Sequence, residues 1–316
     1  MKFLNLLYKL SYILLTLCFL LLVVFLAYIS MPIKTTKTVS LPKGSITKSI
    51  QYLKSQGYAL TIVDTYIVAY LLNQPKSGTL EIGEGEMSRI KFLKKLSSAK
   101  EAINVITLIP GETRPIFLEE LAKKHKLDVS KLETSYDELS SYQEAGIVPE
   151  TYHIAQNSTE KNLIKILIEQ SDKRYKELAR KHLKEYDKKE WLKILTIASI
   201  VQKEAANNEE MPIVASVVYN RLKIEMPLQM DGTLNYGKYS HVKVTPKRIK
   251  EDKSGFNTYA NKGLPPYPVC SVSITAIEAT LKPKETNYLY FMKNKEGVHD
   301  FTKSYKEHLQ NIKKAK

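Results

Sequence analysis

The hydrophobic pattern begins with an uninterrupted apolar run near the N-terminus. No charged residue occurs between positions 10 and 33, and the run is dense in Leu, Val, Ile and Phe. A helix of about 20 such residues crosses the roughly 30 Å hydrocarbon core of a bilayer. The pattern predicts a membrane anchor over residues 10–29, with a short tail inside and the rest of the chain outside. A cleaved signal peptide is the alternative, but the run exceeds a usual signal core and no small-x-small cleavage site follows it.

Two similar patterns follow the apolar run. Residues 37–57 combine a short extended piece, a Pro-Lys-Gly turn and a helix with one apolar face, which Gly57 can end. Residues 103–128 repeat this order as a β-branched strand, a Pro-Gly turn and a helix for which Thr113 is the expected N-cap. The patterns therefore predict two small strand-turn-helix units before residue 130.

The pattern changes twice in the second half. Residues 140–159 are rich in turn formers and are expected to join two modules. Beyond residue 226, Pro, Gly, Tyr, Asn and Thr predict loops, with one clear strand at Tyr288–Met292. Loops rich in Tyr, Asn, Gln and Asp can stack on and hydrogen-bond a polar ligand.

One carboxylate interrupts a helix that otherwise suits the interior. In the segment LTIASIVQKEA, Ile197, Ile200 and Val201 stand seven, four and three positions before Glu204 and therefore share its helix face. Desolvation disfavours a charged carboxylate, raises its pKa and lets it hold a proton near neutral pH, as a general acid must. The alternative is that Glu204 ends the buried segment and turns to water.

Composition and charge narrow the classes of function. A chain of 316 residues that is 43% hydrophobic can bury a core and is expected to hold two domains after the N-terminal segment. The net charge of +15 would suit nucleic acid, but the expected anchor and the lack of a zinc-finger or RNA-binding motif argue against it. Much of the basic charge lies in residues 160–191, where i,i+4 pairs indicate a solvated helix face. Attraction to anionic lipid or to an acidic envelope polymer stays open.

The remaining candidate chemistry is acid–base chemistry of carboxylates. Ordinary glycosidases need a second carboxylate, for which Asp231 is the first candidate, although it could equally be a turn residue. Glu209, Glu210 and Asp300 lie in polar surroundings that suit surface positions. There is no serine-hydrolase, Walker or CxxC motif, and His299 and His308 lack metal-ligand spacing, so neither a metal nor an organic cofactor is expected. Cys18 and Cys270 are the two cysteines, and no intrachain disulfide is expected between them.

Several motifs together resemble one family. The segments LTIASIVQKEA, IVASVVYNRLKIEMPLQMDGTLNYG, FNTYANKGLPPYPV, NYLYFMKNKEGVHDF and EHLQN occur in this order and cover most of residues 192–311. They resemble the YceG-like endolytic murein transglycosylases, known as MltG. The N-terminal half is similar more loosely, through the apolar run, the LPKG and IPGET turns and the EAGIVPETY segment.

The resemblance implies an α+β fold with three parts. These are a cytoplasmic tail and single transmembrane helix over residues 1–33, a small LysM-like α/β module over 34–140, and a mixed α+β catalytic domain over 141–316 with its glutamate on a helix. It also implies a single-pass protein of the bacterial cell membrane whose catalytic domain lies outside and cuts nascent peptidoglycan glycan strands. Peptidoglycan synthases such as penicillin-binding proteins are the protein partners that this activity would suggest.

The family's catalytic glutamate maps onto Glu204, and Gln202 stands where the family typically has a second glutamate. By resemblance, Glu204 would protonate the oxygen between N-acetylmuramic acid and N-acetylglucosamine and then accept the proton of the muramic C6 hydroxyl, leaving a 1,6-anhydro end. The family's substrate contacts map onto seven residues: Asn220, Gln229, Asp231, Thr233, Asn257, Thr258 and Tyr259. Gly232 replaces a usual Pro, Tyr267 a usual small residue, and CSVS an Asn-Pro-Gly-like turn.

Three hypotheses follow from the sequence. The first is a membrane-anchored lytic transglycosylase that terminates or releases glycan strands. The second is a muramidase that uses water with Glu204 and Asp231, and the third is a wall-binding scaffold without enzymatic activity.

Overall fold

The computed structural model describes residues 2–315, and their side chains from residue 5 onward. The fold is mixed α+β with a long apolar N-terminal helix and small two-stranded sheets. The chain forms two compact units. Unit 1 comprises the residues up to 104 together with 153–158, and unit 2 comprises 105–152 and 159 onward.

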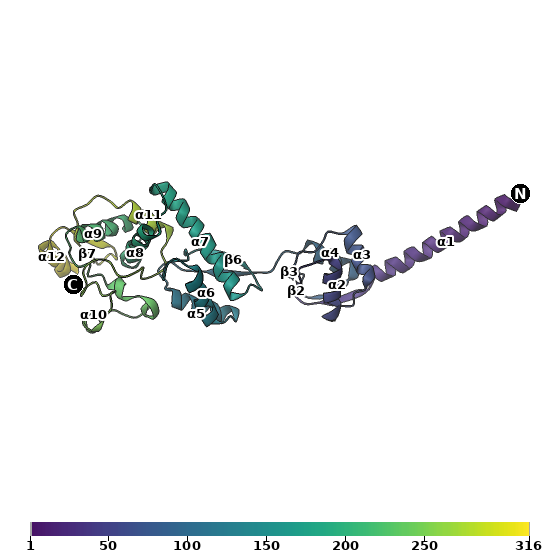
Figure 1. Cartoon of the computed structure of the whole chain (residues 1–316), viewed down its shortest axis with the longest axis horizontal. Coiled ribbons are helices and arrows are strands. Elements are labelled where there is room, and N and C mark those ends of the chain that lie inside the picture. Colours follow the sequence, from purple (N-terminus) through teal and green to yellow (C-terminus); the bar gives the residue numbers. More distant parts are fainter. Residues whose placement is uncertain (1, 316) are drawn as a thin grey trace. The chain divides into compact units, whose positions relative to one another are not determined.

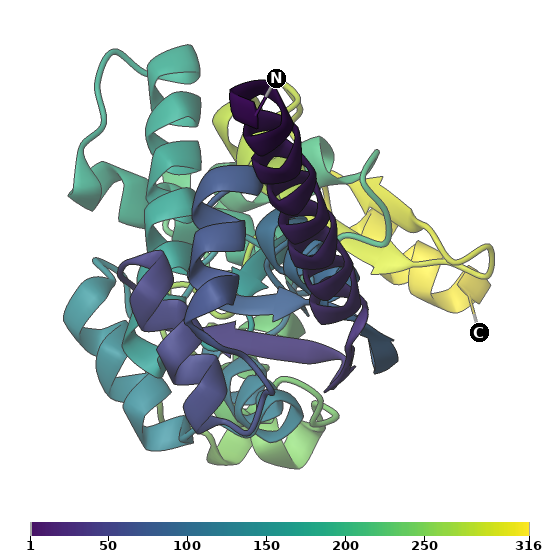
Figure 2. The same ribbon diagram turned by 90° about the vertical axis from the view of Figure 1, so that its right-hand side faces the viewer.

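Helix α1 (Lys2–Ser30) is the first element of unit 1 and is drawn in purple as one unbroken helix (Figures 1 and 2). Its stretch from Asn5 to Ser30 is long and apolar enough to cross a membrane. The side chains of residues 5–27 are exposed, as expected for a helix that meets lipid rather than the protein core. The predicted long apolar N-terminal helix is thereby confirmed.

The rest of unit 1 is a small α/β arrangement. Its elements are β1 (Pro32–Thr35), β2 (Thr38–Leu41), α2 (Ile46–Ser55), α3 (Ile62–Leu71), β3 (Gly78–Glu81), β4 (Gly85–Ser88) and α4 (Arg89–Ser98). Strand β1 pairs antiparallel with β4, and β2 pairs antiparallel with β3. The buried faces of α2, α3 and α4 form a single core with the strands.

Local sequence explains where the helices of unit 1 begin. The Ser45 hydroxyl accepts the Lys48 N–H and caps α2, while Gly57 takes a φ of +90° in the turn after the helix, as predicted. Thr61 and Asp64 form a capping box at the start of α3, in which the Thr61 hydroxyl accepts the Val63 N–H and the Asp64 carboxylate accepts the Thr61 N–H.

The C-terminal end of α1 belongs to the core of unit 1. The Tyr28 hydroxyl lies 2.5 Å from the Thr61 hydroxyl and donates to Asp64 at 2.9 Å. Buried Arg89 binds Asp64 at 2.7 Å, and its guanidinium lies 4.2 Å from the centre of the Tyr28 ring. Tyr28 and Ile29 also pack against the buried apolar side chains of the unit. The end of the helix is therefore fastened to the module that follows it.

Unit 2 holds the larger, mostly helical part. Strand β5 (Ile103–Thr107) pairs with β6 (Thr151–Ala155), and the boundary between the units falls within both strands. The other elements are α5 (Arg114–His125), α6 (Val129–Leu139), α7 (Glu160–His182), α8 (Lys188–Glu204), α9 (Met211–Lys223), two 3₁₀ turns (Asp231–Leu234 and Gly237–Tyr239), α10 (Pro246–Glu251), α11 (Ile274–Leu281), β7 (Tyr290–Lys293), β8 (His299–Thr302) and α12 (Tyr305–Ala315).

The predicted strand near residue 290 is confirmed as β7, although it begins two residues later than expected. Strand β7 pairs antiparallel with β8, and this hairpin and α12 lie together in yellow at the C-terminal end in Figure 2. Thr113 precedes α5 as predicted, but its hydroxyl donates to the Gly237 carbonyl at 2.7 Å instead of capping the helix.

The core of unit 2 surrounds α8. Helices α8, α9 and α11 bury their apolar faces against one another, and residues 194–201 of α8 are buried throughout. Trp191 lies fully buried near the start of α8, with its ring centre 5.7 Å from that of Tyr175 and 5.8 Å from that of Tyr186. The core therefore fixes α8 along its length and presents the last residue of this helix, Glu204, at its end.

The turn-rich segment at 140–159 lies partly inside unit 2. The Gly146 N–H donates to the Tyr136 hydroxyl at 2.9 Å, and a Cβ on Gly146 would lie only 2.5 Å from that oxygen, so glycine is required there. The boundary between the units falls after Tyr152 within this segment. The LysM-like assignment and the predicted division at residues 140 and 141 stay predictions.

Candidate active site

Glu204 is the last residue of α8 and lies at the edge of the unit 2 core. Ile197, Ile200 and Val201 on its face are 5%, 0% and 0% exposed, as the helical spacing predicts, and Glu204 itself is half-buried. The two preceding side chains point elsewhere. Gln202 accepts the Ser273 N–H at 3.1 Å, and the Lys203 ammonium donates to the Ser240 hydroxyl at 3.1 Å.

A backbone N–H holds the Glu204 carboxyl group. The Gly232 N–H donates to Oε1 at 2.6 Å from the 3₁₀ turn that begins at Asp231. A Cβ on Gly232 would lie 2.8 Å from this oxygen and 2.6 Å from the Lys203 Cβ, so the close approach requires glycine. The Pro that is usual here in the resembling family could not make this bond, because proline has no N–H.

The surroundings of Glu204 shift its pKa close to neutral pH. Burial raises the pKa of Glu204 to about 7, the Gly232 N–H opposes this rise, the Asp231 carboxylate adds to it, and the Arg221 guanidinium lowers it. At neutral pH the carboxyl group is thus present in both protonation states. This is the property that a group needs to give a proton in one step and accept one in the next.

Arg221 is a part of this site that the sequence did not predict. It is 6% exposed on α9, and its guanidinium donates to the carbonyls of Leu289, at 2.6 Å, and Leu228. It also lies over the Tyr290 ring at 5.4 Å. Arg221 is the only charged residue in the segment from Met211 to Leu222, and this is the signal that could have indicated a buried electrostatic role.

Two of the predicted substrate contacts, Asp231 and Gln229, are exposed, and a third, Tyr259, is half-buried and bonded to Asp231. Asp231 is exposed, and the Tyr259 hydroxyl donates to its Oδ1 at 2.8 Å. Burial and the Asp231 carboxylate raise the pKa of Tyr259 above its ordinary value, so this hydroxyl stays a donor. Gln229 is exposed as well and takes a φ of +48°, a left-handed conformation that few residues with a side chain adopt.

The other four predicted contacts hold backbone segments in place. Thr233, Asn257 and Thr258 are at most 1% exposed. The Thr258 hydroxyl accepts the Met230 N–H at 3.1 Å and lies 3.0 Å from the Thr233 hydroxyl, while the Asn257 amide donates to two main-chain carbonyls. The Asn220 amide donates to the carbonyls of residues 286 and 288. Their role toward a substrate stays a prediction.

The weaker carboxylate candidates have other partners. Glu210 accepts the His299 ring Nδ1–H at 2.7 Å and the His299 N–H at 2.8 Å. Burial alone would raise the pKa of Glu210, but these hydrogen bonds hold it below its ordinary value. Asp300 accepts from the Asn294 amide at 2.9 Å, and Glu209 is exposed. Glu210 is therefore ionised at neutral pH and is a poor proton donor.

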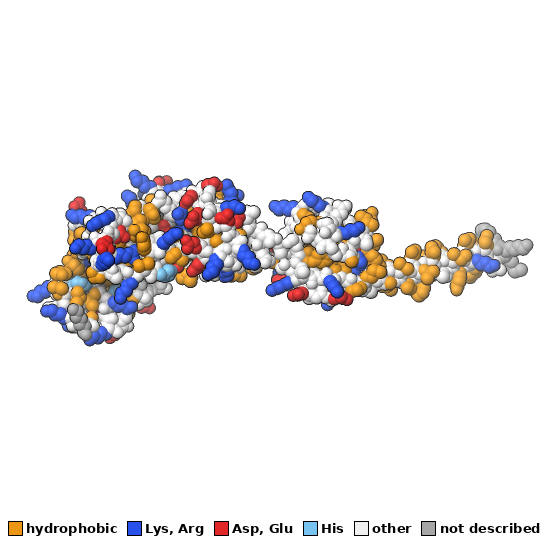
Figure 3. Space-filling view, turned by 90° about the horizontal axis from the view of Figure 1, so that it is seen from below, with side chains coloured by type: hydrophobic (Ala, Val, Ile, Leu, Met, Phe, Trp, Pro, Cys, Tyr) orange, Lys and Arg blue, Asp and Glu red, His pale blue; other side chains and the backbone are white. Residues whose placement is uncertain are grey.

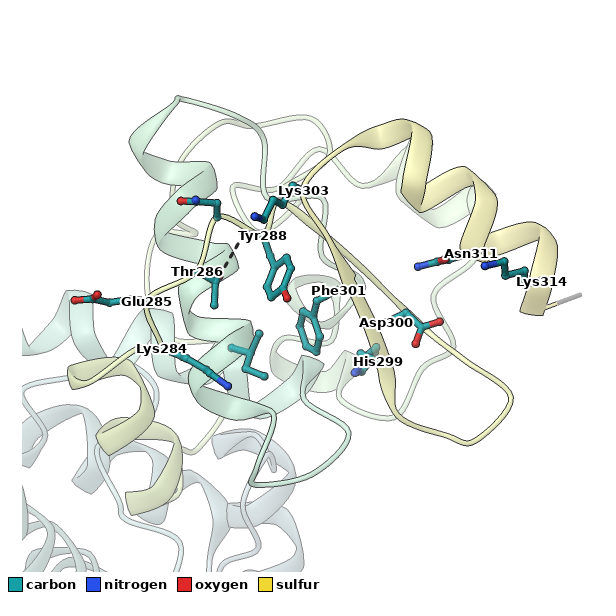
Figure 4. A pocket seen from close by; sticks show the side chains of 12 residues that line it. Lys284, Glu285, Thr286, Tyr288, His299, Asp300, Phe301, Lys303, Asn311 and Lys314 are labelled. Atoms are coloured by element: carbon teal, nitrogen blue, oxygen red, sulfur yellow. Dashed lines mark hydrogen bonds between the residues drawn. The ribbon is translucent and has the colours of Figure 1, made fainter.

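A polar cavity of about 740 Å³ lies beside the hairpin β7–β8 (Figure 4). Ile213 of α9, residues 284–288, β8 and α12 line it, and Figure 4 shows the side chains of Lys284, Lys303 and Lys314 along it. The lining includes His299 and Asp300 but none of the eight predicted site residues. No cluster of three or more His, Cys, Asp or Glu side chains that could hold a metal ion occurs among residues 2–315.

Comparison with known proteins places these features in context. The family described as the YceG-like family matches residues 39–314. A protein of Bacillus subtilis (strain 168) named endolytic murein transglycosylase is 37% identical over 166 residues, which are 52% of this chain and 46% of that protein. A protein of the same name from Streptococcus pneumoniae serotype 2 (strain D39) is 32% identical over 179 residues, 54% of this chain and 31% of that protein. The matched segments thus span less than half of either relative.

The fold is also similar to a solved structure. The crystal structure of a protein described as YceG-like from Listeria monocytogenes superposes with a TM-score of 0.56 at 26% identity, covering 88% of this chain and 99% of that chain.

Proposed function

The chain belongs to the YceG-like family, and we propose that it is a lytic transglycosylase that cuts peptidoglycan glycan strands internally with Glu204 as its general acid and base. The observation that carries this proposal is the state of one carboxyl group: half-buried, held at Oε1 by the Gly232 N–H, and with its pKa raised to about 7. The names of the relatives from Bacillus and Streptococcus agree with this chemistry.

The proposed reaction needs one group that works twice. Protonated Glu204 donates its proton to the glycosidic oxygen as the bond from muramic C1 to that oxygen breaks. The muramic C6 hydroxyl then attacks C1 and returns its proton to the Glu204 carboxylate. The products are a 1,6-anhydro muramic end and a free 4-hydroxyl on the released N-acetylglucosamine, and no water is consumed.

Asp231 supports this reaction without being a second acid. It is exposed, accepts the Tyr259 hydroxyl, and acts on Glu204 through its negative charge, which raises the pKa of Glu204. We assign Gln229, Asp231 and Tyr259 to substrate contact, because Gln229 and Asp231 are exposed and the half-buried Tyr259 donates to Asp231. We assign Asn220, Thr233, Asn257 and Thr258 to holding the loops that carry them.

We further propose that α1 is a retained membrane anchor rather than a cleaved signal, with the two units outside the membrane. Tyr28 and Ile29 pack against the core of unit 1, so cleavage after the apolar run would remove this packing and leave Asp64 and Arg89 without the Tyr28 hydroxyl. An anchored enzyme of this kind would meet nascent strands near the synthases that make them. It could then end strand elongation, with residues 34–140 providing the LysM-like contact to the wall.

One digest tests the reaction. Purified peptidoglycan is incubated with the wild-type chain and with Glu204→Gln, and the products are identified by mass spectrometry. We expect 1,6-anhydro ends with the wild type and none with the variant. Reducing ends would instead support a muramidase that uses water with Asp231, and full activity of the variant would overturn the role of Glu204. A variant that cuts nothing yet restores growth of a deletion strain would support the scaffold hypothesis.

A further inference from the structure

The outward face of α3 in unit 1 is apolar along its whole length. Ile62, Val63, Tyr66, Tyr70 and Leu71 are 59%, 41%, 57%, 80% and 65% exposed. Ala69 is also exposed on this helix. All of α3 lies within the described residues, and its one charged residue, Asp64, is buried. A surface helix of a globular protein normally turns charged and polar residues to water on this side.

Helix α2 provides the internal comparison. It has the same length and packs against α3 in the same small core. Its exposed positions include Lys48, Gln51 and Lys54, and therefore follow the ordinary rule for a helix that faces water. The apolar face of α3 is thus a property of this helix and not of unit 1 as a whole.

The position of α3 relative to α1 identifies what covers this face. The 20 residues from Leu10 to Ile29 rise about 30 Å as a helix, the thickness of the hydrocarbon core, so the outer boundary of the bilayer falls near Tyr28. The Tyr28 hydroxyl contacts Thr61 and Asp64, the N-cap and the first turn of α3. Helix α3 therefore begins at the level where the proposed span leaves the membrane, and Figure 3 shows hydrophobic side chains both along α1 and on the adjoining part of unit 1.

The aromatic residues of the face suit the same level. Tyr66 and Tyr70 stack with their ring centres 6.3 Å apart, and both are exposed. Tyrosine is enriched where hydrocarbon meets headgroups, because its ring is apolar and its hydroxyl can hydrogen-bond there. Amphipathic helices at this boundary bury their apolar face about 5–10 Å into the headgroup and acyl region.

We infer that α3 is an interfacial helix whose face of Ile62, Val63, Tyr66, Ala69, Tyr70 and Leu71 lies in the outer leaflet beside α1. This inference rests on the proposed anchor. The buried pair of Asp64 and Arg89, together with Tyr28, fastens α3 to the end of the span. Unit 1 then contacts the lipid through one defined face, and α1 is not its only contact with the membrane.

Depth-dependent fluorescence quenching tests the inference with the full chain in phospholipid vesicles. In a Cys18→Ser background, Ala69→Cys on α3 and Gln51→Cys on α2 are each labelled with an environment-sensitive nitrobenzoxadiazole dye. Cys270 is 0% exposed and does not react in the folded protein. We expect the label at 69 to shift to the blue and to lose fluorescence with lipids spin-labelled near the headgroup, whereas the label at 51 keeps the emission of a dye in water.

A third labelled protein separates the anchor from the interfacial helix. The wild-type chain is labelled at Cys18, inside the proposed span, and is quenched by lipids spin-labelled deep in the acyl chain if the anchor is correct. If the label at 18 is quenched but the label at 69 behaves like the label at 51, the inference about α3 is overturned and the proposed anchor stands. A loss of quenching at 18 overturns both. A blue shift at 69 that no lipid quencher affects shows that protein or glycan covers the face, and this also overturns the inference.

Adding negative charges to the face gives the second measurement. Adding Tyr66→Glu and Tyr70→Glu to the protein labelled at 69 should reduce quenching by the shallow lipid label, because the face loses its apolar contact with lipid. Thr47→Glu and Gln51→Glu on the exposed side of α2 are the matched control and should leave quenching unchanged. Equal quenching in all three proteins would show that α1 alone sets the depth, and would overturn the role of the α3 face.

Discussion

Glu204 and Glu144 are two carboxyl groups of unit 2 whose pKa burial raises to about 7, but their surroundings differ. Glu144 is 6% exposed and accepts three contacts from main-chain N–H groups: two from Arg114, at 3.1 and 2.9 Å, and one from Ala145 at 3.1 Å. It lies at the N-terminus of α5, where a carboxylate satisfies helix donors that have no partner within the helix. Glu204 is half-buried and accepts the Gly232 N–H on one oxygen.

The difference shows what a raised pKa does and does not indicate. In both groups burial is the largest cause of the raised pKa, and both pKa values end near neutrality. In Glu144 both oxygens are engaged by backbone donors, so the group works as part of the fold. In Glu204, Oε2 accepts no hydrogen bond from any of the described residues, and the side chain is partly exposed to solvent. A substrate oxygen can therefore approach Oε2. Access and an unengaged oxygen therefore separate a candidate acid from a structural carboxylate.

The largest expected effect is on activity in Glu204→Gln. Removing the proton donor should lower the cleavage rate by about 10²–10⁴-fold, because general acid–base catalysis contributes that much. The pKa of Glu204 rises from 4.5 to about 7 on folding, so the fold loses stability as the pH rises between these two values, and Gln removes this cost, which is complete at pH 8. We expect the variant at pH 8 to be more stable by up to about 2 kcal/mol in urea unfolding. A less stable variant at that pH would contradict the assigned burial.

The second-largest effect on the cleavage rate is expected for Gly232→Ala. The added methyl group would meet Oε1 and the Lys203 Cβ, displace the carboxyl group and weaken its hydrogen bond. A misplaced catalytic group can cost about 10²-fold in rate. Gly255→Ala is a milder control, because its Cβ would lie 3.3 Å from the Pro266 side chain. Equal activity of the two variants would show that the Gly232 contact does not position Glu204.

Glu144→Gln should separate stability from activity. Gln keeps an acceptor but places an amide against a backbone donor, so the fold should lose about 1–3 kcal/mol of unfolding free energy. Activity per folded molecule should stay close to that of the wild type. Thermal unfolding followed with a cleavage assay on the same samples measures both. A loss of activity comparable to that of Glu204→Gln would break the distinction between the two carboxyl groups.

Asp231→Asn should have the smallest effect if the lyase proposal holds. It removes a negative charge that raises the pKa of Glu204, so the protonated acid is lost at a lower pH. The fall in activity at rising pH should therefore move downward, by less than about one pH unit. A pH profile of the initial cleavage rate measures this shift. An activity loss as complete as in Glu204→Gln would favour the water-dependent alternative.

Much of this arrangement could be predicted from short-range patterns. The apolar run, the helix after Ser45 and the buried face of Ile197, Ile200 and Val201 depend on periodicity and capping, which are local properties. The family resemblance, through two separate motifs, placed Asp231 and Tyr259 in the set of site residues, and the structure brings them together at 2.8 Å.

The rest depends on contacts between distant segments. A Thr followed by a helix looks like an N-cap, yet Thr113 bonds Gly237, which lies 124 residues away in sequence. The Gly232 N–H could not be predicted from the sequence, because backbone donors carry no residue signature. Buried Thr233, Asn257 and Thr258 are polar loop residues, and only the packing shows that they bond to the protein itself.

Trp191 gives unit 2 a built-in optical reporter. It is the only tryptophan in the sequence and lies fully buried on the same helix as Glu204. Excitation at the red edge of protein absorption, where tyrosine contributes little, therefore reports on the packing of this helix and is silent about unit 1. Emission spectra of the intact chain can then follow the unfolding of unit 2 by itself, without cutting the chain and without adding a dye.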